Sequence, residues 1–220
     1  MRSRFTNSET PAELRHLAFE EVDRSYAIGK VIKKGEAQGV RLCEIGGKEI
    51  VVKSYDFSGV FAAFRIFIRL SRPHKSLRYS FLFRSHDIPC PAHFLVVAKA
   101  GLKSTRAYLL IDYVEGSSLY DLLYLEGDGE LSSETAQAVI DSIKSLHSLG
   151  LAHGDLHTKN ILITNKATVQ LIDLDNVRRS RRRQGRDLSR FLDSVENGKQ
   201  HREILLKKIE EQLPSPRSKG

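Results

Sequence analysis

The sequence lacks the features that mark membrane-spanning and exported proteins. None of its apolar runs reaches the roughly 18 residues that a membrane-spanning helix requires. Charged residues are scattered through the first thirty positions and interrupt any apolar signal-peptide core. We therefore expect a protein that stays in the cytoplasm.

Cysteine is also scarce. Cys43 and Cys90 are the two cysteines of the chain, and each is flanked by apolar residues. Two isolated cysteines make neither a metal site nor a disulfide framework, so we expect reduced thiols in the core. The 220 residues contain no internal repeat and are 40% hydrophobic, which is enough for one domain with a core, built at most as two lobes.

The chain has a net charge of +8 and a sequence pI near 9.5. This excess predicts an anionic partner, and charge alone leaves nucleic acid, phospholipid head groups and a phosphorylated substrate open. Six arginines fall within nine consecutive positions: Arg178, Arg179, Arg181, Arg182, Arg183 and Arg186. Because these charges repel one another, the cluster predicts either an exposed, tail-like loop or an anion site.

The first half of the chain reads as mainly β. Short segments with β-branched residues run from 26 to 53, with a hairpin turn expected at Gly46-Gly47. Residues 57–70 change to a helical period, with one apolar face formed by Phe57, Phe61, Phe64 and Ile68. That helix either packs on the sheet or lies in a membrane interface. Helical character continues over 74–86 and ends before the two prolines of "DIPCP".

After two further strands, the chain reads as mainly helical. Strands are expected near 92–100 and 106–114, helices at 116–125 and at 132–150, strands at 160–164 and 168–175, and a helical tail over 186–212. Ser132 or Ser133 caps the helix that Gly150 ends. The sequence thus predicts an α+β fold with an N-terminal extension (1–25), a β-rich lobe (26–114), a reduced helical lobe (115–212) and a frayed tail (213–220).

One short string carries most of the chemical information. Residues 153–160 read HGDLHTKN and match the phosphotransferase pattern H-R-D-L-x-x-x-N at every position except Gly154. In that pattern the Asp accepts the proton of the attacking hydroxyl and the Asn binds metal, which assigns these roles to Asp155 and Asn160. Asp173 follows thirteen residues after Asn160, at the end of an apolar run. A hairpin would bring the two together to share a Mg²⁺ ion.

Upstream residues fit the same chemistry. Lys53 ends the segment "IVVK", in the style of the strand lysine that neutralises nucleotide phosphates. Gly35 and Gly39 form a turn that would cover these phosphates, and the backbone of Asp112 and Val114 would meet the adenine edge. Taken singly, each has a purely structural explanation as a strand-end lysine or a turn residue. Their order along the chain favours ATP and Mg²⁺ as cofactors.

With these motifs in this order, the chain resembles the protein-kinase-like superfamily. Within it, the chain is most similar to the bacterial lipopolysaccharide core kinases, which phosphorylate heptose or 3-deoxy-D-manno-octulosonic acid (Kdo). The similarity covers about residues 30–195 and is carried by "RPHKSLRYSFLFRSHDIPCP", "LLIDYVEGSSLYDLL", "LHSLGLAHGDLHTKNILI", "LIDLDNVR" and "RDLSRFLDS". It implies a two-lobed fold, a glycolipid acceptor at the cytoplasmic face of the inner membrane, and a buried Asp187 that braces the catalytic loop.

The short spacing after Asp173, the predicted metal ligand, argues independently for a small acceptor. Thirteen residues separate Asp173 from Asp187, whereas protein kinases use a long activation segment to hold a peptide. A sugar hydroxyl suits this short connection better. Arg178, Arg179 and Arg182 would then meet phosphate or carboxylate groups of an acidic sugar or an anionic membrane, and nucleic acid is not favoured. A solvated basic loop is the alternative.

Some features depart from the kinase pattern. The chain has no carboxylate between Asp56 and Asp87, so Lys53 lacks the helix glutamate of protein kinases and would pair with Glu36, Glu44 or the phosphates alone. The metal segment reads DLD, which makes Asp175 a possible second ligand. A small atypical or tRNA-modification-associated kinase and a non-catalytic binding protein remain alternatives. His157 and Lys159 have no assigned role.

Overall fold

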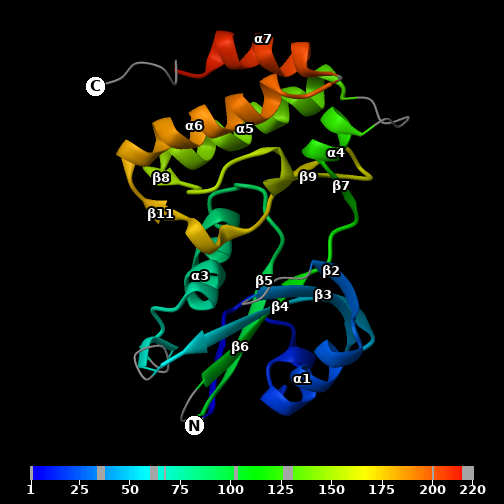
Figure 1. Ribbon diagram of the computed structural model, residues 1–220, viewed down its shortest axis with the longest axis vertical. Helices are drawn as coiled ribbons and strands as arrows, with labels where there is room; N and C mark the ends of the chain where they lie inside the picture. The colour runs from blue at the N-terminus through cyan, green and yellow to red at the C-terminus, as the bar shows by residue number, and fades with distance from the viewer. Residues whose placement is uncertain are drawn as a thin grey trace. The chain divides into compact units, whose positions relative to one another are not determined.

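The computed structural model describes residues 2–33, 38–59, 64–66, 68–101, 104–125, 131–199 and 201–214. The chain divides into two compact units (Figure 1). Unit 1 comprises Met1–Leu82 and Pro91–Tyr113, and unit 2 comprises Phe83–Cys90 and Val114–Gly220. Strands and helices are mixed, as the predicted α+β class requires.

Unit 1 is built on a six-stranded antiparallel sheet with the order β1-β5-β6-β4-β3-β2. Its strands are β1 (Arg2–Thr6), β2 (Lys30–Lys33), β3 (Gln38–Ile45), β4 (Lys48–Ser58), β5 (His93–Ala100) and β6 (Ser104–Asp112). Gly46 and Gly47 join β3 to β4 with φ angles of 62° and 73°. Two successive positive φ values are typical of the tight hairpin turn that the sequence predicts.

Each face of this sheet is covered by a different helix (Figure 1). Helix α1 (Phe19–Ile28) packs on one face in a cluster that includes Val52, and helix α3 (Arg72–Arg84) places Leu77 in a second cluster with Tyr55. Successive side chains of a strand point to opposite faces. Lys53 therefore lies on the same face of β4 as Tyr55, the face that α3 covers.

The segment predicted as an N-terminal extension is part of unit 1. Strand β1 pairs with β5 from Arg2 opposite Lys99 to Thr6 opposite Leu95. Its sequence, RSRFT, holds a single large apolar residue among charges, so the period of two is hard to recognise. Residues 26–28, predicted as strand, end α1 instead, because Phe19, Val22 and Tyr26 repeat at helical spacing and pack against the sheet.

The predicted helix over 57–70 is wrong at its start. Phe57 belongs to β4, opposite Thr105, and its ring stacks at 6.2 Å on Tyr55. Residues 64–66 are helical, but Phe64 is 59% exposed and Ile66 is buried, so the predicted apolar face is not the buried one. Phe61 lies outside the described residues. Helix α3 follows and ends at Arg84, ahead of the two prolines, as predicted.

Unit 2 combines helices with two small sheets. Strands β7 (Gly116–Ser118), β9 (Ile161–Thr164) and β10 (Val169–Leu171) form one sheet, and β8 (Leu151–Ala152) pairs with β11 (Arg178–Arg179) in the other. Helix α7 (Arg202–Gln212) packs against both α5 (Ser133–Ser148) and α6 (Arg181–Glu196) (Figure 1). Helix α4 (Leu119–Tyr124) and the short 3-10 helices η2 (Thr158–Asn160) and η3 (Leu174–Asn176) complete it.

Capping explains where the helices of unit 2 begin. The Ser132 hydroxyl accepts from the Thr135 N–H at the start of α5, and Gly150 follows its end at φ 69°, both as predicted. Helix α4 starts only after Ser118, which forms a capping box with Asp121, because 116–118 are paired with β9.

The arginine cluster is not a loop. Residues 181–186 form the first turns of α6, so the predicted tail helix starts earlier than residue 186. It is also two helices, since α6 ends at Glu196 and α7 begins at Arg202. Arginine is a good helix former, and the buried Leu188, Phe191 and Val195 give α6 its core-facing side. Residues 215–220 of the predicted frayed tail lie outside the described residues.

The two cysteines lie in the core of the protein. Cys43 and Cys90 are buried, and neither is in a disulfide, as predicted. Within the described ranges, no helix is long and apolar enough to cross a membrane.

Candidate active site

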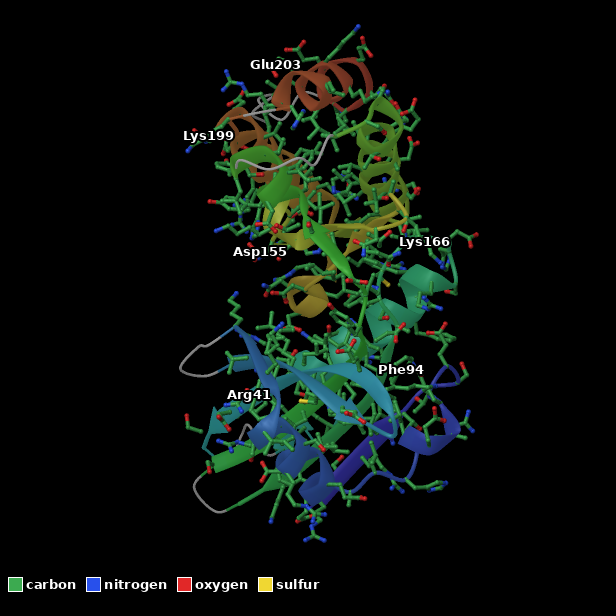
Figure 2. All side chains as sticks on the ribbon, turned by 90° about the vertical axis from the view of Figure 1, so that its right-hand side faces the viewer. Arg41, Phe94, Asp155, Lys166, Lys199 and Glu203 are labelled. Carbon is green, nitrogen blue, oxygen red and sulfur yellow. The ribbon has the colours of Figure 1, made fainter. Side chains whose placement is uncertain are left out.

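The candidate catalytic loop follows β8 in unit 2, where Asp155 is labelled in Figure 2. Gly154 has a φ of 81°, and a Cβ atom there would collide with the carbonyl oxygen of Asn176. Only glycine tolerates both conditions at low cost. This explains the single departure from the H-R-D-L-x-x-x-N pattern, because an arginine at position 154 would not fit.

Asp187 of α6 fixes this loop through two backbone hydrogen bonds. Its carboxylate is 3% exposed and accepts from the N–H groups of His153 at 2.6 Å and of Gly154 at 2.9 Å. Nε2 of His147, at the end of α5, lies 3.6 Å from Asp187 Oδ2. Two charge-assisted bonds to consecutive backbone groups fix the loop relative to α6. This is the geometry that the resemblance implies for a bracing aspartate.

His153 is fully buried and lies among carboxylates. Its Nε2 lies 3.1 Å from the carbonyl oxygen of Ile172, and this contact assigns the ring proton to Nε2. Burial lowers the pKa of His153, against the opposing influence of Asp187, Asp173 and Asp155. The imidazole is therefore neutral at pH 7, and it positions the catalytic loop relative to the strand that precedes Asp173.

The hairpin after the catalytic loop brings the backbone next to Asp173 up to Asn160, and a metal shared by the two side chains stays a prediction. Strands β9 and β10 form a hairpin, and the Ile172 N–H donates to the Asn160 carbonyl at 3.0 Å. Asp173 adopts left-handed backbone angles (φ 61°, ψ 61°), a strained conformation that is enriched at functional sites. The Asn160 side-chain NH₂ donates to the carbonyl oxygen of Asp155 at 2.8 Å, so the donor end of the amide is bound to the loop.

These two side chains fit a magnesium ion. An amide oxygen and a carboxylate are hard ligands, and Mg²⁺ commonly binds through one or two such groups together with phosphate oxygens and water. No cluster of three or more His, Cys, Asp or Glu suitable for a metal occurs in the described part of the chain. A site completed by nucleotide phosphates does not require such a cluster. Asp175, the possible second ligand, is 8% exposed in η3.

His157 and Lys159, for which the sequence suggests no role, support the loop. His157 Nδ1 accepts from the Lys159 N–H at 3.2 Å and caps η2, and burial lowers the pKa of His157. Its Nε2 lies 3.6 Å from Asp155 Oδ2 and 3.3 Å from the Asn160 NH₂ nitrogen. The Lys159 ammonium lies 4.2 Å from the ring centroid of Tyr120, a cation–π contact with α4.

Arg190 is the site residue that sequence reasoning missed. Its Nη1 lies 2.6 Å from Asp155 Oδ1 and 3.3 Å from the carbonyl oxygen of Gly154. A signal for it existed, because Arg190 stands three residues after Asp187 and therefore on nearly the same side of α6. Asp155 thus has one carboxylate oxygen against Arg190 and the other toward Asn160 and His157.

Two of the three arginines predicted to bind anions pair with the strand that leads into the catalytic loop. Arg178 and Arg179 form β11, which pairs with Ala152 and Leu151 immediately before His153. Arg178 also donates from Nε to the carbonyl of Asn176 at 3.2 Å. Arg178, Arg179 and, in the first turn of α6, Arg182 are exposed. Their anion-binding role stays a prediction.

In unit 1, Lys53 is 7% exposed and lies between Val40 of β3 and Leu109 of β6. Its ammonium is 5.6 Å from the Tyr55 ring centroid. Glu44 is four residues along β3 from Val40, about 13 Å at the rise of a strand, which argues against it as a partner of Lys53. Glu36 lies outside the described residues.

Gly39 has a packing explanation. It lies opposite Ser54, whose hydroxyl accepts from the Gly39 N–H at 3.0 Å, and a Cβ atom at Gly39 would collide with the hydroxyl of Tyr26. This contact lies on the α1 face of the sheet, opposite to the face of Lys53. Gly35 lies outside the described residues. That the turn covers nucleotide phosphates stays a prediction.

Asp112 and Val114 lie where the chain passes from unit 1 to unit 2. Asp112 ends β6, and its N–H donates to the carbonyl of Ala92 at 2.8 Å. Any backbone contact of Asp112 with a base would therefore use its carbonyl oxygen. The predicted adenine contacts of both residues remain untested.

Comparison with known proteins points to kinases. The family described as "Lipopolysaccharide kinase (Kdo/WaaP) family" matches residues 82–211, more than half of the chain. Among curated proteins, CBL-interacting serine/threonine-protein kinase 13 of Arabidopsis thaliana is 27% identical over 67% of this chain and 28% of its own length. Serine/threonine-protein kinase kin-29 of Caenorhabditis elegans is 27% identical over 74% of this chain and 19% of its own.

The family match covers the unit 2 part of the predicted site residues. The family match contains the catalytic loop, the metal segment and α6, whereas Lys53 lies outside it. The chain spans less than a third of the length of these curated relatives. Both comparisons identify the same class of protein, and they support the predicted kinase-like fold. The chain belongs to the lipopolysaccharide kinase (Kdo/WaaP) family.

Proposed function

We propose that this protein transfers phosphate from ATP to a sugar hydroxyl, of heptose or Kdo, in the core of lipopolysaccharide. The observation that carries the proposal is the arrangement in unit 2. Asp155 and Asn160 share one loop, strand β9 follows this loop, and Asp173 comes just after β10, the strand that pairs with β9. We propose further that it acts on this acceptor at the cytoplasmic face of the inner membrane, where its positive charge favours anionic surfaces.

In this mechanism Asp155 orients the acceptor hydroxyl and takes its proton as the phosphoryl group is transferred. Asn160 and Asp173 would hold Mg²⁺, which supplies charge neutralisation at the phosphates. Lys53 would bind the α- and β-phosphates of ATP. Positioning and electrostatic stabilisation provide most of the rate, as expected for phosphoryl transfer.

The chain between Asp173 and Asp187 supports a small acceptor. Every residue of this connection is described, and it consists of η3, the two residues of β11 and the first turns of α6 with short joints between them. It contains no extended segment of the kind that holds a peptide in protein kinases. The family match to lipopolysaccharide kinases supports the same conclusion.

A protein acceptor is the second candidate, because the curated relatives quoted above are named serine/threonine-protein kinases. The two candidates differ in the product. Radiolabel from [γ-³²P]ATP should enter defined truncated lipopolysaccharides that end in Kdo or in heptose, and a generic protein substrate beside them should stay unlabelled. Label in the protein and none in the glycolipid would replace the first candidate by the second.

Asp155→Asn tests the assigned base. We expect it to reduce transfer by about 100-fold or more while ATP binding is retained, because only proton removal and orientation of the hydroxyl are lost. Asp141→Asn is the matched control, since this exposed carboxylate lies on α5 and accepts from the side chain of Gln137. Full activity of Asp155→Asn would show that the assignment is wrong.

A further inference from the structure

The ion pair between Arg190 and Asp155 raises a problem for catalysis. Asp155 Oδ1 lies 2.6 Å from Arg190 Nη1, and Oδ2 lies 3.4 Å from the Asn160 NH₂ nitrogen and 3.6 Å from His157 Nε2. Both oxygens of the assigned base therefore have neighbours. An acceptor hydroxyl has to share or displace one of them before it can give up its proton.

Arg190 is the neighbour that an acceptor meets from the solvent side. Its side chain is 53% exposed, compared with 27% for His157, while Asn160 is buried. Nη1 is the nitrogen that contacts Asp155 and Gly154, so the N–H donors on Nε and Nη2 are not used in these two contacts. A guanidinium group can bind a second carboxylate or phosphate through its remaining N–H donors.

Further arginines extend this charge along α6. Arg183 and Arg186 precede Arg190 by seven and four residues, and at about 100° per residue the three fall within an arc of about 60°. The row spans about 10 Å along the helix axis. Arg186 and Arg190 are exposed and Arg183 is half-buried. The row therefore leads along the helix toward Asp155.

We propose that Arg190 determines acceptor specificity by binding an anionic group, a carboxylate or a phosphate, that lies next to the accepting hydroxyl. Binding of this group offsets the loss of the Asp155 contact and releases Oδ1 for the hydroxyl. A neutral acceptor offers no such compensation and leaves the base paired. Arg183 and Arg186 bind additional anionic groups of the same glycolipid. The inference rests on the proposed function and names the substrate property that the site selects.

The test compares acceptors that differ only in charge. One pair is a Kdo-terminated glycolipid and its carboxylate methyl ester, and the other is a phosphorylated heptose glycolipid and its dephosphorylated form. We expect the native protein to prefer the charged member of at least one pair by on the order of 10- to 100-fold in kcat/KM. The pair that shows the preference identifies the carboxylate or the phosphate as the group bound.

Arg190→Gln should remove most of this preference, mainly by raising the KM for the charged acceptor, and leave the KM for ATP unchanged. Arg190→Lys should keep part of it, because the charge remains and the fork geometry is lost. Arg181→Gln is the matched control, since Arg181 is exposed and lies on the opposite side of α6, nine residues away at about 100° each. Thermal unfolding of all three variants checks that the fold is intact.

The possible outcomes separate the two proposals. If Arg190→Gln lowers kcat equally for charged and neutral acceptors, Arg190 only orients Asp155 and the specificity role is wrong. An unchanged preference in Arg190→Gln also overturns it, although the proposed function would stand. Absence of transfer by the native protein to every glycolipid would overturn the proposed function and this inference together.

Discussion

Replacing Asp187 by Asn should weaken the attachment of the catalytic loop to α6 with little change of shape. The native carboxylate accepts two backbone N–H bonds, whereas the amide keeps one acceptor oxygen and turns its NH₂ toward the other N–H. Bonds to a charged acceptor contribute about 1.5–3 kcal/mol each, and a neutral bond contributes about 1 kcal/mol. Losing one bond and weakening the other should lower the free energy of unfolding by about 3 kcal/mol.

For a protein of this size, this loss corresponds to a decrease in Tm of roughly 6–12 °C. Calorimetry gives the Tm, and phosphate transfer measured below the new Tm gives the activity. We expect the activity to fall as well, because position 187 holds the loop that presents Asp155 less firmly through the N–H groups of His153 and Gly154. Asp193→Asn, an exposed position of the same helix, is the control. A native Tm and native activity in Asp187→Asn would refute the bracing role.

Two further predictions concern backbone fit and acid stability. Gly154→Ala should reduce transfer by about 100-fold or more, because the φ of 81° and the collision with Asn176 would displace the adjacent Asp155. Gly185→Ala on α6 is the control. A Cβ atom there meets nothing within 4 Å, so this change should stabilise the protein by about 0.5–1 kcal/mol. A native rate in Gly154→Ala would contradict the packing argument. Burial lowers the pKa of His74 to about 4. The neutral imidazole therefore contributes stability that is fully present above the unfolded-state pKa near 6.5. This stability is lost as the pH falls from 6.5 toward 4, and the loss is at most roughly 3 kcal/mol. Urea denaturation across this range should show a shallower pH dependence in His74→Gln, and an unchanged slope would argue against the neutral buried imidazole.

The parts of the site that sequence could predict are those fixed by local spacing. Asp155 and Asn160 share one short loop, and Asp173 follows a hairpin whose apolar strands are legible from their composition. The end of α3 before the prolines and the caps of α5 were predictable for the same reason, since each depends on a few adjacent residues.

The parts that sequence could not predict depend on distant partners. β1 is recognisable as a strand only through its pairing with β5, more than eighty residues away. Phe57 reads as helical because aromatic residues recur at 61 and 64, yet β6 draws it into the sheet. Arg190 looks like one more surface arginine until the fold brings Asp155 to it, from 35 residues earlier in the chain.

The placement of Asp187 and Arg190 on one turn of α6 has a mechanical consequence. One residue fixes the backbone that carries the base, and the other contacts the side chain of that base. If α6 shifts by thermal motion or on binding of the glycolipid, the base and its arginine shift together. Their separation is therefore set by the rigidity of a single helical turn, which makes it insensitive to movements in the rest of the protein.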